Sequence, residues 1–195
     1  MAGFSKMAVF STAIASLVWP ATLSWAAPLP GALVYTVVIP AGEFGSSAFT
    51  GVVVGGLASA RKFCAELEGT AYRVDCLAER FGALAKSIPK NSDYAEVQAV
   101  LKSASDQMAN LARTNRDRDL PRGRATRPGS TETTSRPLTP VSATSAAQVN
   151  RQALAILDDT QTLLLRSAQG SKSKTAQYAQ IADAIGSNKV LLRAA

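Results

Sequence analysis

The two cysteines of the chain, Cys64 and Cys76, place the strongest constraint on its fold. They are the only thiols among 195 residues, and they stand twelve residues apart. In one unbroken helix over residues 57–88, their Cα atoms would lie about 18 Å apart, at a rise of about 1.5 Å per residue. A disulfide needs Cα atoms within about 7 Å. A bond between them therefore requires the chain to reverse direction in the intervening segment.

The residues between the cysteines supply a place for that reversal. Gly69 can adopt the left-handed conformation that ends a helix, and Thr70 is a competent N-cap for the next one. We expect a helical hairpin, with Cys64 near the end of its first helix and Cys76 in the second turn of its second. A redox-active pair is the alternative, but catalytic dithiols usually have the C-x-x-C spacing.

The N-terminal residues 1–26 have the pattern of a secretory signal peptide. One cation, Lys6, precedes an apolar run, and residues 24–26 match the small-x-small pattern of a signal peptidase site. Cleavage there predicts a periplasmic or secreted protein, in a compartment where two thiols tend to pair. An uncleaved membrane anchor over residues 7–25 is the alternative, although that run is only marginally long enough and contains Pro20.

The absence of histidine excludes several kinds of chemistry. It removes imidazole acid–base catalysis, histidine-activated nucleophiles and the commonest metal ligand. Two cysteines alone cannot complete the four-ligand set of a structural zinc site. The S-x-x-K matches at 87–90 and 171–174 are too short to indicate a serine hydrolase. We therefore expect a non-catalytic protein with no catalytic residue, cofactor or metal; an enzyme that uses carboxylates and tyrosines is the alternative.

Residues 27–56 form an apolar, glycine-rich segment. Leu33–Ile39 is rich in β-branched residues and predicts a strand or extended stretch before Pro40. Gly51 and Gly55 have the G-x-x-x-G spacing of transmembrane helix pairs, but the apolar run around them is too short to span a bilayer. Close helix packing through small residues is the simpler expectation. A membrane-associating or partner-binding segment is the alternative.

Apolar periodicity predicts helices on both sides of the middle of the chain. Residues 70–88 and 93–113 carry apolar side chains at steps of three and four, while Glu79 and Arg80 lie off the first stripe. The second stripe is a heptad-like seam, long enough for a bundle helix but too short to indicate a free coiled coil.

The C-terminal part repeats this pattern over residues 145–169 and about 173–185. In the first of these helices the apolar stripe runs through Leu163, with Leu164 widening it. The apolar tail at residues 190–192 is expected to dock on the bundle, because three adjacent apolar side chains are poorly placed in water.

We therefore predict an all-α fold, an irregular bundle of four to five helices that contains a disulfide-stapled helical hairpin, an apolar N-terminal segment and a disordered basic linker. The hairpin belongs to a helical region at 57–113, and the linker covers 114–142. A C-terminal helical region at 143–195 packs on the first, because neither half has enough apolar surface to close a core alone.

The linker at residues 114–142 is the best candidate for a binding function. It contains four prolines, many serines and threonines, and a run of arginines, in a chain of formal net charge +7. Guanidinium groups bind phosphates and carboxylates bidentately. The anion-binding candidates are Arg116, Arg118, Arg122, Arg124 and Arg127. A solvated linker that binds nothing is the alternative, since charge runs are usually solvated.

The compartment limits the partners of such a linker. Outside the cytoplasm the available polyanions are lipid headgroups, glycans and acidic proteins, so we expect an anionic envelope surface or an acidic protein and no nucleic acid. The linker also lacks aromatic side chains that could stack on bases. The expected function is that of a cell-envelope binding or interaction protein with no stable transmembrane span after cleavage. The alternative is a membrane-anchored envelope component held by its N-terminal apolar segments.

Overall fold

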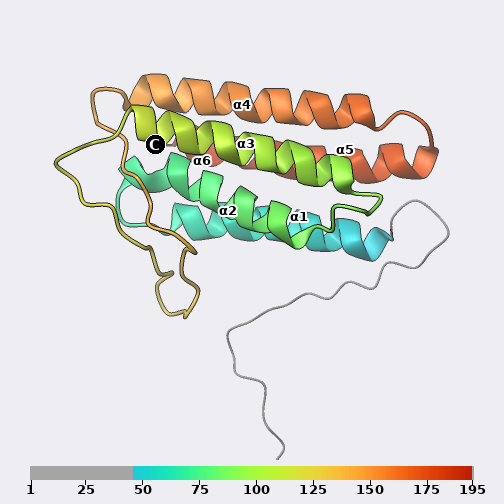
Figure 1. The fold of residues 1–195 in the computed structure, drawn as a ribbon, viewed down its shortest axis with the longest axis horizontal. Helices are drawn as coiled ribbons and strands as arrows, with labels where there is room; N and C mark the ends of the chain where they lie inside the picture. The colour runs from blue at the N-terminus through green and yellow to red at the C-terminus, as the bar shows by residue number, and fades with distance from the viewer. Residues whose placement is uncertain (1–45, 195) are drawn as a thin grey trace, which may run out of the picture. The chain divides into compact units, whose positions relative to one another are not determined.

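The computed structural model describes residues 46–194, which form a helical bundle (Figure 1). The signal peptide and the extended stretch at Leu33–Ile39 lie outside the described residues. The five long helices run in alternating directions along the bundle (Figure 1). The helices are α1 Ser47–Ala65, α2 Arg73–Ser87, α3 Ala95–Thr114, α4 Ala146–Ser167, α5 Lys172–Ser187 and the short α6 Lys189–Arg193, with a 3-10 turn at Thr70–Tyr72. The prediction of an all-α bundle is confirmed.

The disulfide-stapled hairpin is formed by α1 and α2. Cys64 and Cys76 are bonded, their Cα atoms lie 5.8 Å apart, and both side chains are fully buried. Gly69 lies in the reversal with a φ of 96°, a conformation that glycine adopts without steric cost. Its role differs from the expected helix cap, because α1 already ends at Ala65 and Gly69 instead precedes the 3-10 turn. The hairpin prediction is confirmed, with the reversal spread over more residues.

The first helix begins earlier than the predicted boundary at residues 56/57. Ser46 caps it, with its Oγ accepting a hydrogen bond from the Phe49 amide at 3.2 Å. Gly51 and Gly55 do not mediate close packing, since a Cβ at either position would have no neighbour within 4 Å. Gly56 does, because a Cβ there would lie 2.8 Å from Leu84 Cδ1. The boundary at 56/57 is therefore wrong, and α1 belongs wholly to the bundle.

The predicted apolar stripes of the helices meet in one core. α2 and α3 make the most extensive helix contact, and the C-terminal helices pack on them. In α4 the buried side is offset by one residue, with Leu164 fully buried and Leu163 exposed. Leu191 and Leu192 of α6 are buried, which confirms that the tail docks, while Val190 is exposed.

The segment predicted to be a disordered linker instead follows a fixed path. We call residues 115–142 the arginine loop. Its two limbs run antiparallel, with isolated bridges at Arg116–Val141, Gly123–Leu138 and Thr126–Thr133. Four β-branched or apolar side chains of the second limb are buried, namely Thr134, Leu138, Thr139 and Val141. The prediction of disorder at 114–142 is corrected, because this limb enters the core despite the polar composition of the segment.

Hydrogen bonds also fasten the loop to the hairpin turn. The Val141 amide donates to the Ala71 carbonyl at 2.9 Å, and the Tyr72 hydroxyl donates to the Pro121 carbonyl at 2.8 Å. Both limbs are therefore tied to the turn that the disulfide closes. Within residues 46–194, no helix combines the length and the apolar character that crossing a bilayer needs.

Replacing both cysteines (C64A with C76A) is predicted to lower the free energy of unfolding by about 3 kcal/mol, because the disulfide closes a short loop of the unfolded chain. Urea denaturation followed by circular dichroism measures this difference. In reductant, the gap between wild type and variant should shrink to about 1 kcal/mol, the cost of the smaller side chains. A gap unchanged by reductant would mean that the cysteines are not bonded.

Candidate functional site

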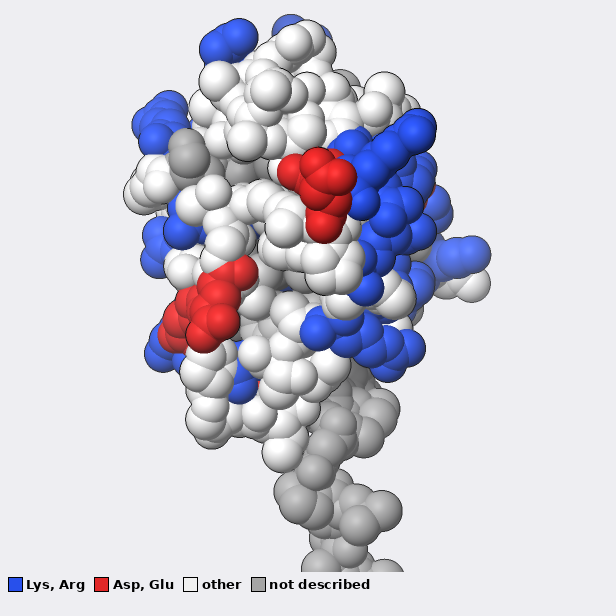
Figure 2. Space-filling model, turned by 90° about the vertical axis from the view of Figure 1, so that its left-hand side faces the viewer, with Lys and Arg blue, Asp and Glu red and all other residues white. Residues whose placement is uncertain are grey.

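The candidate arginines lie in the arginine loop, at the end of the bundle where α3 ends and α4 begins (Figure 1). In four of them the side chain is exposed and forms no ion pair with any residue of the described part of the chain. They are Arg116, Arg118, Arg122 and Arg124. Seen from this end, basic side chains gather along the right-hand side of the surface (Figure 2). These four arginines are the part of the predicted anion-binding site whose guanidinium groups are exposed and without an ion pair in the described residues.

Arg127 has a different role from the other four. Its side chain is partly buried, and Nε donates to Glu66 Oε2 at 2.7 Å, with Nη2 3.4 Å from Glu66 Oε1. Glu66 is the C-cap residue directly after α1. Since this guanidinium is already matched by a carboxylate, Arg127 fastens the loop to the helical hairpin and is not grouped with the exposed arginines.

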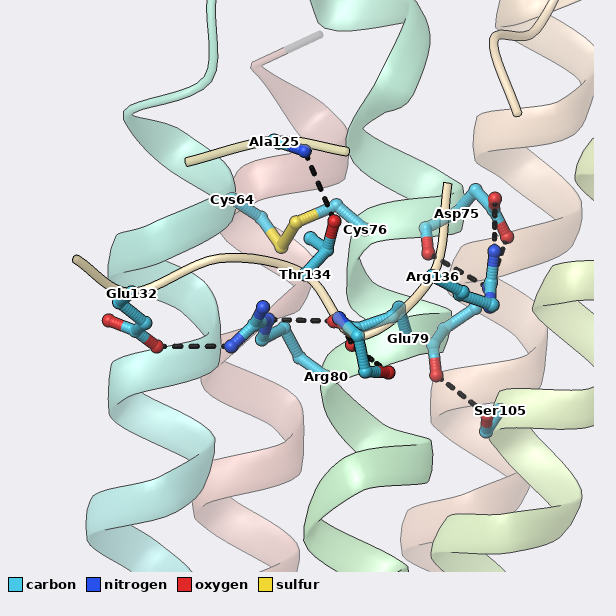
Figure 3. Close-up of polar contacts among 12 residues, drawn as sticks. Cys64, Asp75, Cys76, Glu79, Arg80, Ser105, Ala125, Glu132, Thr134 and Arg136 are labelled. Carbon is cyan, nitrogen blue, oxygen red and sulfur yellow. Dashed lines mark hydrogen bonds and ion pairs between the residues drawn. A yellow bond between two sulfur atoms is a disulfide. The ribbon is translucent and has the colours of Figure 1, made fainter. Parts of the chain in front are cut away.

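Asp75 of α2 holds the second limb of the loop. Its carboxylate is 1% exposed and accepts a bidentate pair from Arg136, with Nη1 and Nη2 each at 2.7 Å (Figure 3). It also accepts from the Thr139 amide at 2.6 Å. The hydrogen bond and the charge of Asp75 raise the pKa of Arg136 above its ordinary value, although burial opposes this. One buried carboxylate thus fixes both a side chain and the backbone of the loop.

Glu79, one helical turn further along α2, makes the adjacent set of contacts. Its Oε1 accepts from the Ser135 amide at 2.8 Å and from the Ser135 hydroxyl at 2.7 Å (Figure 3). Its Oε2 lies 2.8 Å from Arg80 Nε, an ion pair whose geometry is not that of a hydrogen bond. Arg80 Nη1 in turn donates to Glu132 Oε1 at 3.0 Å, and the guanidinium lies 4.0 Å from the centre of the Phe63 ring. Glu79 and Arg80 are therefore paired with the loop and with one another.

We call the contacts of Asp75 and Glu79 with the arginine loop the clasp. The sequence patterns did not predict it. Glu79 and Arg80 lie off the apolar stripe of their helix, which predicted solvent exposure, yet Glu79 is 4% exposed. Asp75 and Glu79 are four residues apart, a spacing that puts both on one side of a helix. That spacing is the only available signal, and it does not identify a loop far along the chain as the partner.

A second polar cluster lies at the opposite end of the bundle, where Tyr94 and Tyr178 are fully buried. The Tyr94 hydroxyl lies 2.9 Å from Thr50 Oγ1, and the Tyr178 hydroxyl donates to Glu96 Oε2 at 2.8 Å. Burial raises the pKa of both tyrosines above the ordinary value, so both stay protonated at neutral pH. These hydrogen bonds join α1, α3 and α5. The raised pKa values make the two phenols less suited to acid–base catalysis near neutral pH.

Glu96 in this cluster is also held by Lys174, whose Nζ lies 2.6 Å from Oε2. Burial alone would raise the pKa of Glu96, but the hydrogen bonds from Lys174 and Tyr178 outweigh it and lower that pKa. The carboxylate therefore remains charged and acts as an acceptor between α3 and α5.

No group of three or more potential metal-binding side chains comes together among residues 46–194. Comparison of the chain with protein-family models, curated proteins and solved structures finds no match. The site is therefore defined by its own geometry, an exposed group of arginines on a loop that buried carboxylates fix in place.

Asp75→Asn is predicted to lower the free energy of unfolding by about 2–3 kcal/mol, because it weakens charge-assisted hydrogen bonds to Arg136 and to the Thr139 amide. It should also speed tryptic cleavage after Arg122 and Arg124 as the loop detaches. Urea denaturation and timed proteolysis measure the two effects.

The matched control is Asp106→Asn, which removes an exposed carboxylate paired with Lys102. This change should cost less than about 1 kcal/mol and leave tryptic cleavage unchanged. Equal effects of the two substitutions would show that Asp75 has no special role in holding the loop.

Proposed function

We propose that this protein is an exported, non-catalytic binding protein whose arginine loop contacts an anionic lipid surface. The observation that carries the proposal is the group of four exposed arginines without ion pairs among the described residues, on a loop fixed to the bundle. A fixed loop loses less conformational entropy on binding than a disordered linker would. The loop therefore has the charge and the order that a binding surface needs.

The chemistry of the loop favours phosphate-bearing lipid as the partner. Guanidinium groups match phosphate oxygens bidentately. Leu120 is 38% exposed between the two pairs of arginines, where its side chain can reach the apolar side of a headgroup layer. Each arginine near an anionic membrane contributes about 1 kcal/mol, so four together give a measurable affinity.

The acidic residues of the loop do not cancel this charge. Asp117 Oδ1 accepts from the amides of Asp119 and Leu120, at 2.8 and 3.2 Å. This local turn directs the chain around Leu120, as aspartate side chains commonly do in loops. Asp117 therefore supports the turn, and Arg116, Arg118, Arg122 and Arg124 outnumber the aspartates beside them.

The location of the protein is a separate part of the proposal. The buried disulfide is compatible with a compartment outside the cytoplasm, where such bonds persist. We propose that residues 1–26 direct export to the periplasm or the medium and are then removed. Supporting this are the N-terminal sequence pattern and the disulfide together.

Expression of the full chain in a bacterial host with a secretion pathway tests the location. The intact mass of the recovered protein should correspond to a chain that begins near Ala27, with thiols that react with alkylating reagent only after reduction. A mass that retains residues 1–26, together with two reactive thiols, would contradict export.

Lipid binding is predicted to depend on the four exposed arginines. Cosedimentation with phosphatidylglycerol vesicles should show binding that weakens with salt, and no binding to phosphatidylcholine vesicles. The variant R116Q/R118Q/R122Q/R124Q should bind at least about tenfold more weakly, because it removes most of the attraction to phosphate.

The control R61Q/R151Q/R166Q/K172Q removes the same charge from exposed positions outside the loop. It should bind nearly as well as wild type. Equal losses of vesicle binding in both variants would mean that binding depends only on net charge. If wild type does not bind vesicles, the lipid surface is rejected as the partner, and an acidic protein takes its place.

A further inference from the structure

A groove runs along the outer side of α2 and α3, beside the arginine loop. Its volume is about 960 Å³. Its lining includes small side chains from both helices, namely Gly82, Ala85, Ala99, Ser105 and Ala109. Five cations also line it, namely Lys86, Lys90, Lys102, Arg113 and Arg136. We call this feature the α2–α3 groove.

The small side chains explain why the surface is hollow there. A Cβ at Gly82 would lie 2.7 Å from Ser105 Oγ, so only glycine lets the two helices approach this closely. Ser105 is turned toward α2, where its hydroxyl donates to the Ala78 carbonyl at 2.6 Å. Its side chain therefore does not fill the groove, and neither do the alanines on either side.

The charges that line the groove are mostly positive and partly unmatched. Glu79 is engaged with Ser135 and Arg80, and Asp106 pairs with Lys102 at 2.5 Å. Three further cations, Lys86, Lys90 and Arg113, are exposed and form no ion pair with any residue in the range 46–194. The field in the groove therefore favours an anionic occupant.

We infer that the α2–α3 groove binds an acidic peptide segment of a partner protein. The glycine and alanine floor suits the apolar side of a helical peptide, and the lysines on the rim suit its carboxylates. Gln98 and Arg113 both line the groove and lie fifteen residues apart on α3, a span of about 22 Å. A helical peptide of about fifteen residues has the same length.

This inference goes beyond lipid contact by the arginine loop and does not require it. Arg113 lies at the loop end of the groove, three residues before Arg116. A partner bound along the groove would therefore lie beside the surface that the loop contacts. Such a protein would join an acidic partner to an anionic surface.

The probe for the groove is a fluorescent sixteen-residue helical peptide with one leucine–alanine face and glutamates on both sides of it. A scrambled peptide of the same composition lacks the apolar face. Fluorescence anisotropy with the full mature protein should detect saturable binding of the first peptide, and binding of the scrambled peptide at least about tenfold weaker.

Two variants of the groove separate shape from charge. Ala99→Trp fills the exposed floor without a change of charge, and K86Q/K90Q removes two rim cations. Each should weaken peptide binding about tenfold, the equivalent of about 1.4 kcal/mol. Circular dichroism and urea denaturation check that both variants keep the fold of wild type.

The arginine-loop variant R116Q/R118Q/R122Q/R124Q separates the two proposals. It should lose vesicle binding and keep peptide binding, while A99W should do the reverse. The groove inference is overturned if wild type does not bind the peptide, if both peptides bind equally, or if A99W binds as tightly as wild type. A failure of vesicle binding alone would leave the groove inference standing.

Discussion

The contact between Asp75 and the second limb of the arginine loop is the interaction on which the candidate site depends. A carboxylate that is 1% exposed must be matched by donors, because an unpaired buried charge costs several kcal/mol. Arg136 and the Thr139 amide supply those donors from a segment more than sixty residues along the chain. The hydrogen bonds that match the buried charge of Asp75 thus hold a polar, proline-containing segment in one ordered conformation.

The disulfide and the clasp lie within the same short stretch of α2. Cys76 stands next to Asp75 and three residues before Glu79, so the staple fixes the start of the helix that carries both carboxylates. The loop is therefore ordered because it is bonded to a hairpin that the disulfide already holds in place. The four exposed arginines at this end of the bundle and the groove beside it then form one basic region. Some of its cations pair with carboxylates and hold the structure together, and the others remain exposed.

The helices and the hairpin could be predicted from the sequence because apolar periodicity and cysteine geometry are local signals. The ordered conformation of the loop could not be predicted, since it depends on contacts with residues far away in the sequence. Thr134, Leu138 and Val141 become buried in a segment whose composition indicates disorder, and Glu79 becomes buried on a polar side of its helix. Five arginines were identified as one set, yet only the structure separates Arg127, which pairs with Glu66, from the others.

The most direct test of a fixed arginine loop is amide hydrogen exchange of the native, oxidised protein, resolved by residue across 115–142. The account predicts slow exchange for amides that donate to backbone or side-chain acceptors, among them Asp117, Thr134, Ser135, Leu138, Thr139 and Val141. Their protection should approach that of the helices. Exchange of all of them at the rate of an unfolded chain would contradict the account, because the arginines would then lie on a disordered linker.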